Sequence, residues 1–287
     1  MLARLSAYLE MTKPRAMIIV WVTAAAGLFV ARSGQPMDWA LFLHLAIGVL
    51  TSGGGSIVLN QVLERRYDER MDRTKNRPLP AGKVEPIRAL AFGIALSLLG
   101  ILWLAVFVNA ITAILSGLSI VTYVLLYTPL KRVTTLNTAV GAVPGAIPPM
   151  MGWSAEHATL DLEAGLLFAI LFVWQFPHFL AIAWLHREDY ERAGYSMLPR
   201  FDPSGMITGR QMVMNTALLW PLCLLPTYFG FTSIAFAFGA TVLCVLLMGL
   251  SVVFAARRDD RSARWMLKGS VLHISLLMVA MVVDGLL

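Results

Sequence analysis

Four polar residues of this chain recur at intervals of four positions: Asn60, Glu64, Asp68 and Asp72. On an α-helix this spacing stacks side chains on one face, about 6 Å from each position to the next. The row offers only oxygen ligands, which suit a hard divalent ion such as Mg2+ that keeps some waters and bridges to phosphate oxygens. We interpret the row as a metal site for a diphosphate substrate.

The alternative is a solvated helix end whose acids pair with the nearby arginines, Arg65, Arg66, Arg70 and Arg73. The stretch from Arg73 to Pro80 reads Arg-Thr-Lys-Asn-Arg-Pro-Leu-Pro. Because it is basic and interrupted by proline, it could hold an anionic group. Together with the shared helical register of one amide and three acids, this stretch favours the metal site.

Two further segments carry charges that could serve the same chemistry. Residues 186–192 read His-Arg-Glu-Asp-Tyr-Glu-Arg and include Asp189, and the following Met197-Leu198-Pro199 echoes Pro78-Leu79-Pro80. Two acidic segments facing one cavity could hold metal ions around a diphosphate, although an ordinary charged loop is the alternative. Between them, Lys131 and Arg132 could clamp diphosphate oxygens or only record membrane orientation.

The elements that position these residues must be membrane helices. The 287-residue chain is 58% hydrophobic and only 14% charged, with a mean hydropathy of +0.71, values that exclude an ordinary soluble protein. Apolar stretches long enough to cross a bilayer recur along the chain. Nine spans are predicted: residues 16–31, 40–63, 87–108, 111–127, 137–153, 163–185, 213–229, 234–256 and 268–286.

With nine spans, every lysine and arginine except Arg32 falls on one side. The positive-inside rule then places the amino terminus in the cytoplasm, and the net charge of +6 is an orientation signal that gives no support for nucleic acid as a partner. A cleaved signal peptide is disfavoured because the first apolar run continues to Val30. The long charged loops, at about residues 64–86 and 186–211, place the chemistry on the cytoplasmic side.

Small and polar residues inside the spans add three expectations. Residues 52–56, Ser-Gly-Gly-Gly-Ser, predict close helix packing. The prolines of the fifth span predict one wall of a cavity, because each frees a backbone carbonyl. Cys223 and Cys244 lie in apolar runs and are expected to be core residues without a disulfide.

Several short segments, taken in their order along the chain, resemble the UbiA superfamily of intramembrane prenyltransferases, and within it the protohaem IX farnesyltransferase (haem O synthase) branch. The resemblance covers nearly the whole chain. The segments that carry it are Thr12-Lys13-Pro14-Arg15, residues 60–80, Tyr127 to Thr134, residues 141–153, Trp174-Gln175-Phe176-Pro177-His178-Phe179, and Asp189 to Pro199.

The resemblance implies transfer of the farnesyl group of farnesyl diphosphate to a vinyl group of haem b, with addition of water, to give haem O for terminal oxidase assembly. It implies Mg2+ as cofactor, with Asn60, Glu64, Asp68 and Asp72 in the first metal motif and Asp189 in the second. The residues expected to bind diphosphate are Arg73, Arg77, Lys131 and Arg132. The residues expected to be catalytic are Asn60, Glu64, Asp68 and Lys131.

His178, which follows a proline in the sixth span, is the candidate haem contact. Two departures from the family pattern concern the metal site. Glu64 stands where aspartate is usual, and Asp189 has no second aspartate four residues away, so Glu188 and Glu191 rank below it as substitutes.

The expected protein is therefore one all-α membrane domain over residues 1–287, with nine helices around a central cavity that opens to the cytoplasm and is capped by the two long loops. Its expected partners are farnesyl diphosphate, haem b and the lipid bilayer, with a downstream haem-modifying enzyme as a candidate. The absence of a transit peptide favours the bacterial cytoplasmic (inner) membrane. Alternatives are transfer to an aromatic acceptor such as 4-hydroxybenzoate, and a haem or ion carrier or assembly protein without catalysis.

Overall fold

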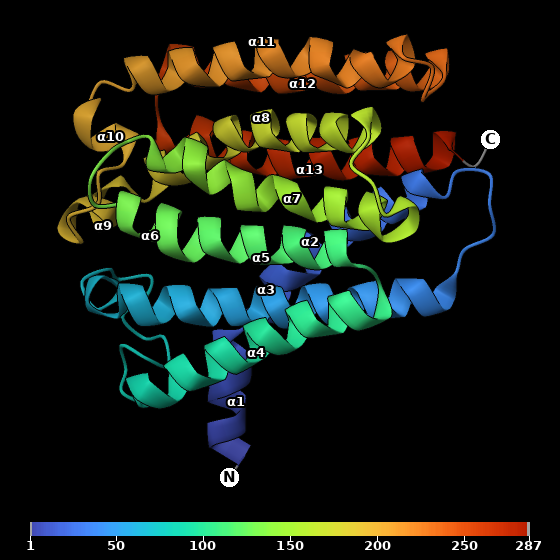
Figure 1. Cartoon of the computed structure of the whole chain (residues 1–287). Helices are drawn as coiled ribbons and strands as arrows, with labels where there is room; N and C mark the ends of the chain where they lie inside the picture. The colour runs from blue at the N-terminus through green and yellow to red at the C-terminus, as the bar shows by residue number, and fades with distance from the viewer. Residues whose placement is uncertain (1, 286–287) are drawn as a thin grey trace.

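The computed structural model describes residues 2–285, which form helices and connecting turns without a β-strand (Figure 1). In chain order the helices are α1 (Leu2–Met11), α2 (Pro14–Ala31), α3 (Trp39–Asp68), α4 (Pro86–Phe107), α5 (Ala110–Val121), the π-helical segment η1 (Thr122–Tyr127), α6 (Thr128–Leu130), α7 (Asn137–His157), α8 (Leu162–Leu185), α9 (Arg187–Arg192), α10 (Leu198–Phe201), α11 (Met206–Tyr228), α12 (Ile234–Arg257) and α13 (Asp260–Asp284).

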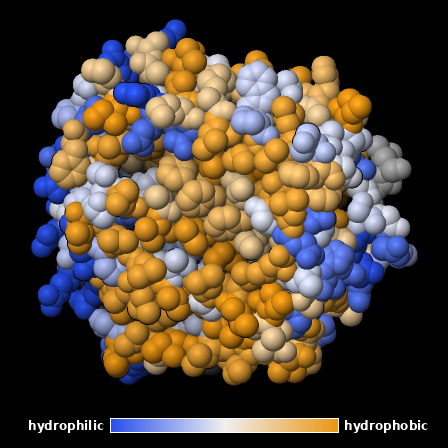
Figure 2. All heavy atoms as spheres, turned by 45° about the horizontal axis from the view of Figure 1, so that its top comes forward, coloured by the Kyte–Doolittle hydropathy of each residue, from blue (hydrophilic) through white to orange (hydrophobic). Residues whose placement is uncertain are grey.

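The long helices run side by side, and α1 crosses their direction at one edge (Figure 1). Helices α9 and α10 lie at one end of the bundle together with the connections over residues 69–85 and 131–136. We call this the loop end, and the opposite end, where α7 passes into α8, the far end. Apolar side chains form a broad band between polar groups at the two ends (Figure 2), as expected for a bundle surrounded by acyl chains.

Seven of the described helices are long and apolar enough to cross a membrane: α2, α3, the continuous segment from α5 through η1 to α6, α4, α8, α12 and α13. The two other predicted spans are also helical, as α7 and α11. Both helices contain prolines in their interior, and α11 has polar residues in its first turns. All nine predicted segments are thus helices, while the nine-span count stays a prediction. The predicted end of the last span, Leu286, lies outside the described residues.

Two boundaries differ from the sequence-based expectation in ways that affect function. Helix α3 ends at Asp68, with Glu69 as its C-cap, so the prediction that Asp72 continues the same helical face is wrong. The fourth predicted span is not a single α-helix, because it widens into η1 at Thr122–Tyr127. Helix α1 was missed, since ten residues are too short to be recognised as a span.

Glycines allow the helices near the site to approach closely. A Cβ on Gly152 of α7 would lie 1.9 Å from the carbonyl oxygen of Ala24 in α2, and one on Gly55 of α3 would lie 2.6 Å from the backbone nitrogen of Ser97 in α4. The predicted role of the glycines in span two is confirmed. Cys223 and Cys244 are free and buried among apolar residues, also as predicted.

Candidate active site

Helix α3 places Asn60, Glu64 and Asp68 on one buried face at the loop end. Their exposed fractions are 2%, 4% and 1%. Burial of two carboxylates is costly unless each is paired. The structure therefore excludes a solvated helix end for these residues, although it leaves their role in catalysis a prediction.

Each residue of this face has a specific partner. The Asn60 amide donates to Thr128 Oγ1 at 2.8 Å. Lys131 Nζ lies 2.7 Å from Glu64 Oε1, and Arg77 Nη1 lies 2.7 Å from Asp68 Oδ2. Two of the four cations predicted to bind diphosphate thus contact the two buried carboxylates, and Glu64 is buried despite its extra methylene.

One oxygen of this face has no partner in the described part of the chain. Asp68 Oδ1 is buried without a hydrogen bond. A buried, unsatisfied carboxylate oxygen beside an amide and a second carboxylate fits the oxygen ligand set of Mg2+. Within residues 2–285, no three His, Cys, Asp or Glu side chains come close enough to hold a metal ion by themselves. The donor set therefore fits an ion that completes its shell with water and phosphate oxygens.

The two acidic segments meet at the loop end. The Asp72 backbone nitrogen donates to Asp189 Oδ1 at 3.2 Å, and Arg192 contacts both carboxylates. Asp72 is exposed, and its hydrogen bond with Lys75 and the charge of Arg192 lower the pKa of its carboxyl. The structure brings Asp72 and Asp189 together, whereas Glu188 and Glu191 are exposed on α9, and a metal site shared by the two segments stays a prediction.

The loops also share apolar and backbone contacts. Met71 packs in one buried cluster with Ala193, Tyr195 and Met197. The Ser196 backbone nitrogen donates to the Lys131 carbonyl at 2.6 Å. The connections that follow α3 and α8 are therefore packed against each other, and the second of them also binds the backbone of Lys131.

A half-buried cation that the residue patterns did not single out joins the group. Lys13 immediately precedes α2, and burial together with the charges of Arg77, Lys131 and Arg73 lowers its pKa to about 8, opposed by Asp68. Its signal was its place in the segment Thr12-Lys13-Pro14-Arg15, directly before a membrane helix. Positive charges concentrated in this way attract an anion.

Aromatic rings surround the paired lysine. Lys131 Nζ lies 4.4 Å from the ring centre of Tyr127 and 5.7 Å from that of Tyr195. Burial lowers the pKa of Lys131, but Glu64 and the tyrosines outweigh it, so the pKa is raised well above its usual value. Arg132 instead stacks on Tyr67 at 4.0 Å and donates to the Leu63 carbonyl, so its guanidinium is engaged with the end of α3. Arg73 is exposed.

An apolar cavity of about 390 Å3 lies between α2, α3, α5, η1, α7 and α8. Ile57, one turn of α3 before Asn60, belongs to its wall, as do Tyr123 and His178. Pro144 and Pro148 line it too, which confirms the predicted role of the fifth span's prolines. The buried polar face thus adjoins an apolar chamber.

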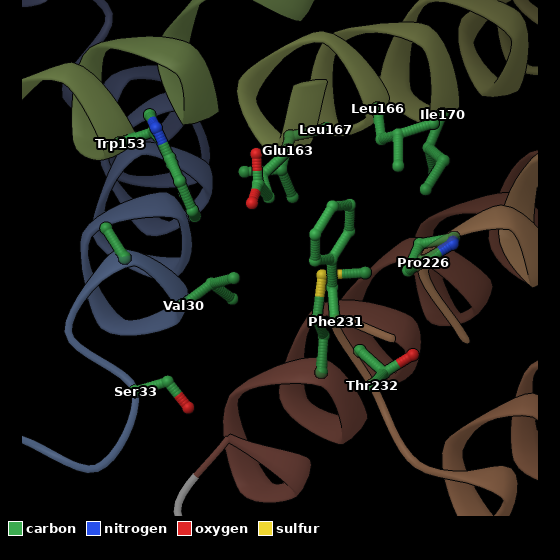
Figure 3. Close-up of a pocket in the computed structure, with 12 residues that line it drawn as sticks. Val30, Ser33, Trp153, Glu163, Leu166, Leu167, Ile170, Pro226, Phe231 and Thr232 are labelled. Carbon is green, nitrogen blue, oxygen red and sulfur yellow. The ribbon is translucent and has the colours of Figure 1, made fainter. Parts of the chain in front are cut away.

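A second cavity, of about 210 Å3, lies at the far end (Figure 3). Glu163 and Phe231 project into it, with Trp153 and Val30 on one side (Figure 3). No lysine or arginine lines it. It therefore lacks the paired acids and bases of the loop end.

Comparison with known proteins identifies the family. Residues 20–277 match the model of the UbiA prenyltransferase family. This chain belongs to the UbiA prenyltransferase family. Among UbiA relatives, it is similar to proteins named protoheme IX farnesyltransferase from Solibacter usitatus (40% identical, covering 96% of this chain and 98% of the relative) and Salinibacter ruber (40% identical, 98% and 99%).

Solved UbiA-type structures share the fold. A digeranylgeranylglyceryl phosphate synthase superposes with a TM-score of 0.82 at 17% identity, covering 98% of each chain. A UbiA homolog from Archaeoglobus fulgidus bound to GPP and Mg2+ gives a TM-score of 0.70 at 15% identity, covering 96% of this chain and 99% of the other. The helical bundle described above is therefore the UbiA fold.

Proposed function

We propose that this protein transfers the farnesyl group of farnesyl diphosphate to a vinyl group of haem b, with addition of water, giving haem O for terminal oxidase assembly. One juxtaposition carries the proposal: a buried row of acids and cations adjoins an apolar cavity that contains a histidine. The chain is also 40% identical, over nearly its full length, to a protein named protoheme IX farnesyltransferase.

The cations of the loop end bind and orient the diphosphate. Lys131 and Arg77 each hold a carboxylate at 2.7 Å, and the half-buried Lys13 lies near them. When diphosphate binds, these positive charges stabilise the negative charge that grows as the farnesyl C1–O bond breaks. Arg73 and Arg132 contribute from the edge of the site, Arg73 from an exposed position and Arg132 from its stack on Tyr67.

The acids and the amide provide metal ligands. Asn60, Glu64 and Asp68 take this role from α3, and Asp72 and Asp189 take it from the joined loops. Bound Mg2+ would neutralise diphosphate oxygens and improve the leaving group. Because Asp68 Oδ1 is buried without a hydrogen-bond partner among the described residues, Asp68 is the ligand that we expect to matter most.

The cavity accommodates the apolar parts of the reaction. Its tyrosine, tryptophan and phenylalanine side chains exclude water from the allylic cation that forms when diphosphate leaves, and ring faces attract such a cation. The vinyl carbon of haem b then forms the new bond to farnesyl C1, and water adds to the adjacent vinyl carbon and releases a proton. His178 is the proposed haem contact.

We further propose that α7 and α11 cross the membrane, giving nine spans in one domain with the loop end and amino terminus in the cytoplasm and the loops capping the site. The location is the bacterial cytoplasmic membrane. The positive-inside distribution supports this, since Arg32 alone among the lysines and arginines lies on the opposite side in the nine-span arrangement. A downstream haem-modifying enzyme is a proposed partner.

The decisive assay offers detergent-purified protein farnesyl diphosphate and Mg2+ with either haem b or 4-hydroxybenzoate, and reads products by mass spectrometry. We expect a haem product heavier by a farnesyl group plus water, and no product after chelation of Mg2+. Prenylated benzoate with untouched haem would refute the acceptor. Absence of product in both tubes from haem-binding protein would indicate a carrier.

A further inference from the structure

His178 of α8 is held from one side by helix α13. Its Nδ1 lies 2.9 Å from Ser270 Oγ, and its ring stacks on Trp174 with centroids 5.0 Å apart. The Trp174 indole N–H donates to the Ser270 backbone carbonyl at 2.8 Å. One fully buried residue therefore fixes both the histidine and the ring stacked on it.

The other imidazole nitrogen faces the cavity. His178 is part of the cavity wall. Among the described residues, His178 Nε2 has no hydrogen-bond partner. The atom is not among the fully buried polar atoms without a partner, so part of its surface is exposed. Nε2 is therefore accessible from the cavity.

The hydrogen bonds of Ser270 decide which nitrogen carries the proton. The Ser270 hydroxyl donates to the Leu267 carbonyl at 2.9 Å, which leaves its oxygen to accept from His178 Nδ1–H. In this arrangement every donor is satisfied. In the opposite tautomer, Nε2–H would point into an apolar cavity without an acceptor among the described residues, which costs free energy.

We propose that Ser270 is a positioning residue that holds His178 in its Nδ1-protonated form, with the Nε2 lone pair directed into the cavity as a ligand for haem iron. A metal-binding histidine usually donates its second ring N–H to a fixed acceptor, which sets its orientation and basicity. The iron-ligation part of this inference rests on the proposed function, whereas the tautomer stands on the hydrogen bonds alone.

The tautomer is tested in the protein without haem. The measurement is nitrogen-15 NMR of histidine-labelled protein in detergent, and the His178 signals are assigned by their disappearance in His178→Gln. We expect these signals to show a protonated Nδ1 and an unprotonated Nε2. In Ser270→Ala both tautomers of His178 should be populated, and Ser270→Thr should restore the Nδ1-protonated tautomer. An unprotonated Nδ1 in the unaltered protein overturns the proposal even if Ser270→Ala does not fold.

Haem binding provides the second readout. Ser270→Ala should weaken binding of haem b by about 10-fold, within the range seen when a partner of a metal ligand is removed, and should alter the electron paramagnetic resonance spectrum of ferric haem. The control is Ser251→Ala, since Ser251 is an equally buried hydroxyl that pairs with Thr216 away from the cavity. Equal effects of the two variants would overturn the positioning role.

The His178→Gln variant separates this inference from the proposed function. If it leaves the haem spectrum unchanged, iron ligation by His178 is wrong, whatever the tautomer. If farnesyl transfer to haem fails while His178→Gln and Ser270→Ala still change the haem spectrum, the positioning role stands and the proposed reaction is wrong.

Discussion

The residues of the site illustrate how a buried carboxylate is stabilised. Glu64 and Asp68 each lie opposite one cation at 2.7 Å, in a region where an unpaired charge would cost several kcal/mol. The same cations are those suited to an anionic substrate. In the proposed function, charge neutrality before substrate binding and affinity for diphosphate therefore come from the same side chains.

For single residues we predict that Asp68→Ala and Asn60→Ala each lower kcat by about 100-fold or more. Each change removes a proposed ligand of the Mg2+ ion that stabilises the diphosphate leaving group. Turnover by purified protein measures this, with elution as a monodisperse peak to show folding. Glu191→Ala, an exposed acid on α9, is the control and should keep its activity. Normal turnover in both variants would remove the metal assignment.

A second prediction concerns Lys131. Lys131→Met should raise KM for farnesyl diphosphate more than KM for haem b, and should also destabilise the protein by about 3–5 kcal/mol because Glu64 is left buried without its partner. Adding Glu64→Gln should restore thermal stability but not activity. A larger change in KM for haem b would place Lys131 at the acceptor.

The elements matter because they set the directions of these side chains. Helix α3 carries three members of the predicted metal site and then ends, so Asp72 contacts Asp189 from the loop and not from the helix face. At the end of the π-helical segment η1, the Tyr123 carbonyl accepts from both the backbone N–H and the hydroxyl of Thr128, and that hydroxyl accepts from Asn60. Wider turns of this kind occur often at functional sites.

At the scale of elements we predict that Gly152→Val destabilises the protein by about 1–3 kcal/mol, because α2 and α7 cannot separate without cost. A Cβ there would lie 1.9 Å from the Ala24 carbonyl oxygen. Thermal unfolding in detergent measures the effect. The control is Gly165→Ala in α8, where a Cβ meets nothing within 4 Å and stability should rise slightly. Equal melting temperatures for the two variants would contradict the packing argument.

The whole molecule is organised by charge and by apolar surface. Nine spans put all basic residues except Arg32 on the side of the loop end. The arrangement requires α7 and α11 to cross the bilayer even though neither is among the seven helices that are long and apolar enough by themselves. Their proline and polar positions are tolerable where they face the bundle or its cavity.

For the whole molecule we predict the sidedness of four exposed positions. Cysteines introduced for Leu160 and Phe229 should react with an impermeant maleimide on intact cells, and those for Leu136 and Phe201 only after permeabilisation. Cys223 and Cys244 should give little background, since both are fully buried. Labelling of Leu136 and Leu160 from the same side would mean that α7 does not cross.

The sequence by itself determined the class of protein and the helical segments, and it predicted the metal and diphosphate chemistry. Helices inside a bilayer must satisfy their own backbone hydrogen bonds, so apolar length alone predicts them, and the spacing of Asn60, Glu64 and Asp68 fixes a shared face. The haem acceptor came only from resemblance, because composition and spacing carry no information about it.

Only the tertiary structure decided which residues meet. Helix α3 ends at Asp68, Lys13 joins the cations, and Ser270 holds His178 across 92 positions of the chain. Contacts between segments so far apart depend on how helices pack, and packing depends on shape across the whole bundle, as at Gly152. Local patterns describe one helix at a time, so they could predict the metal row but not the partners that neutralise and orient it.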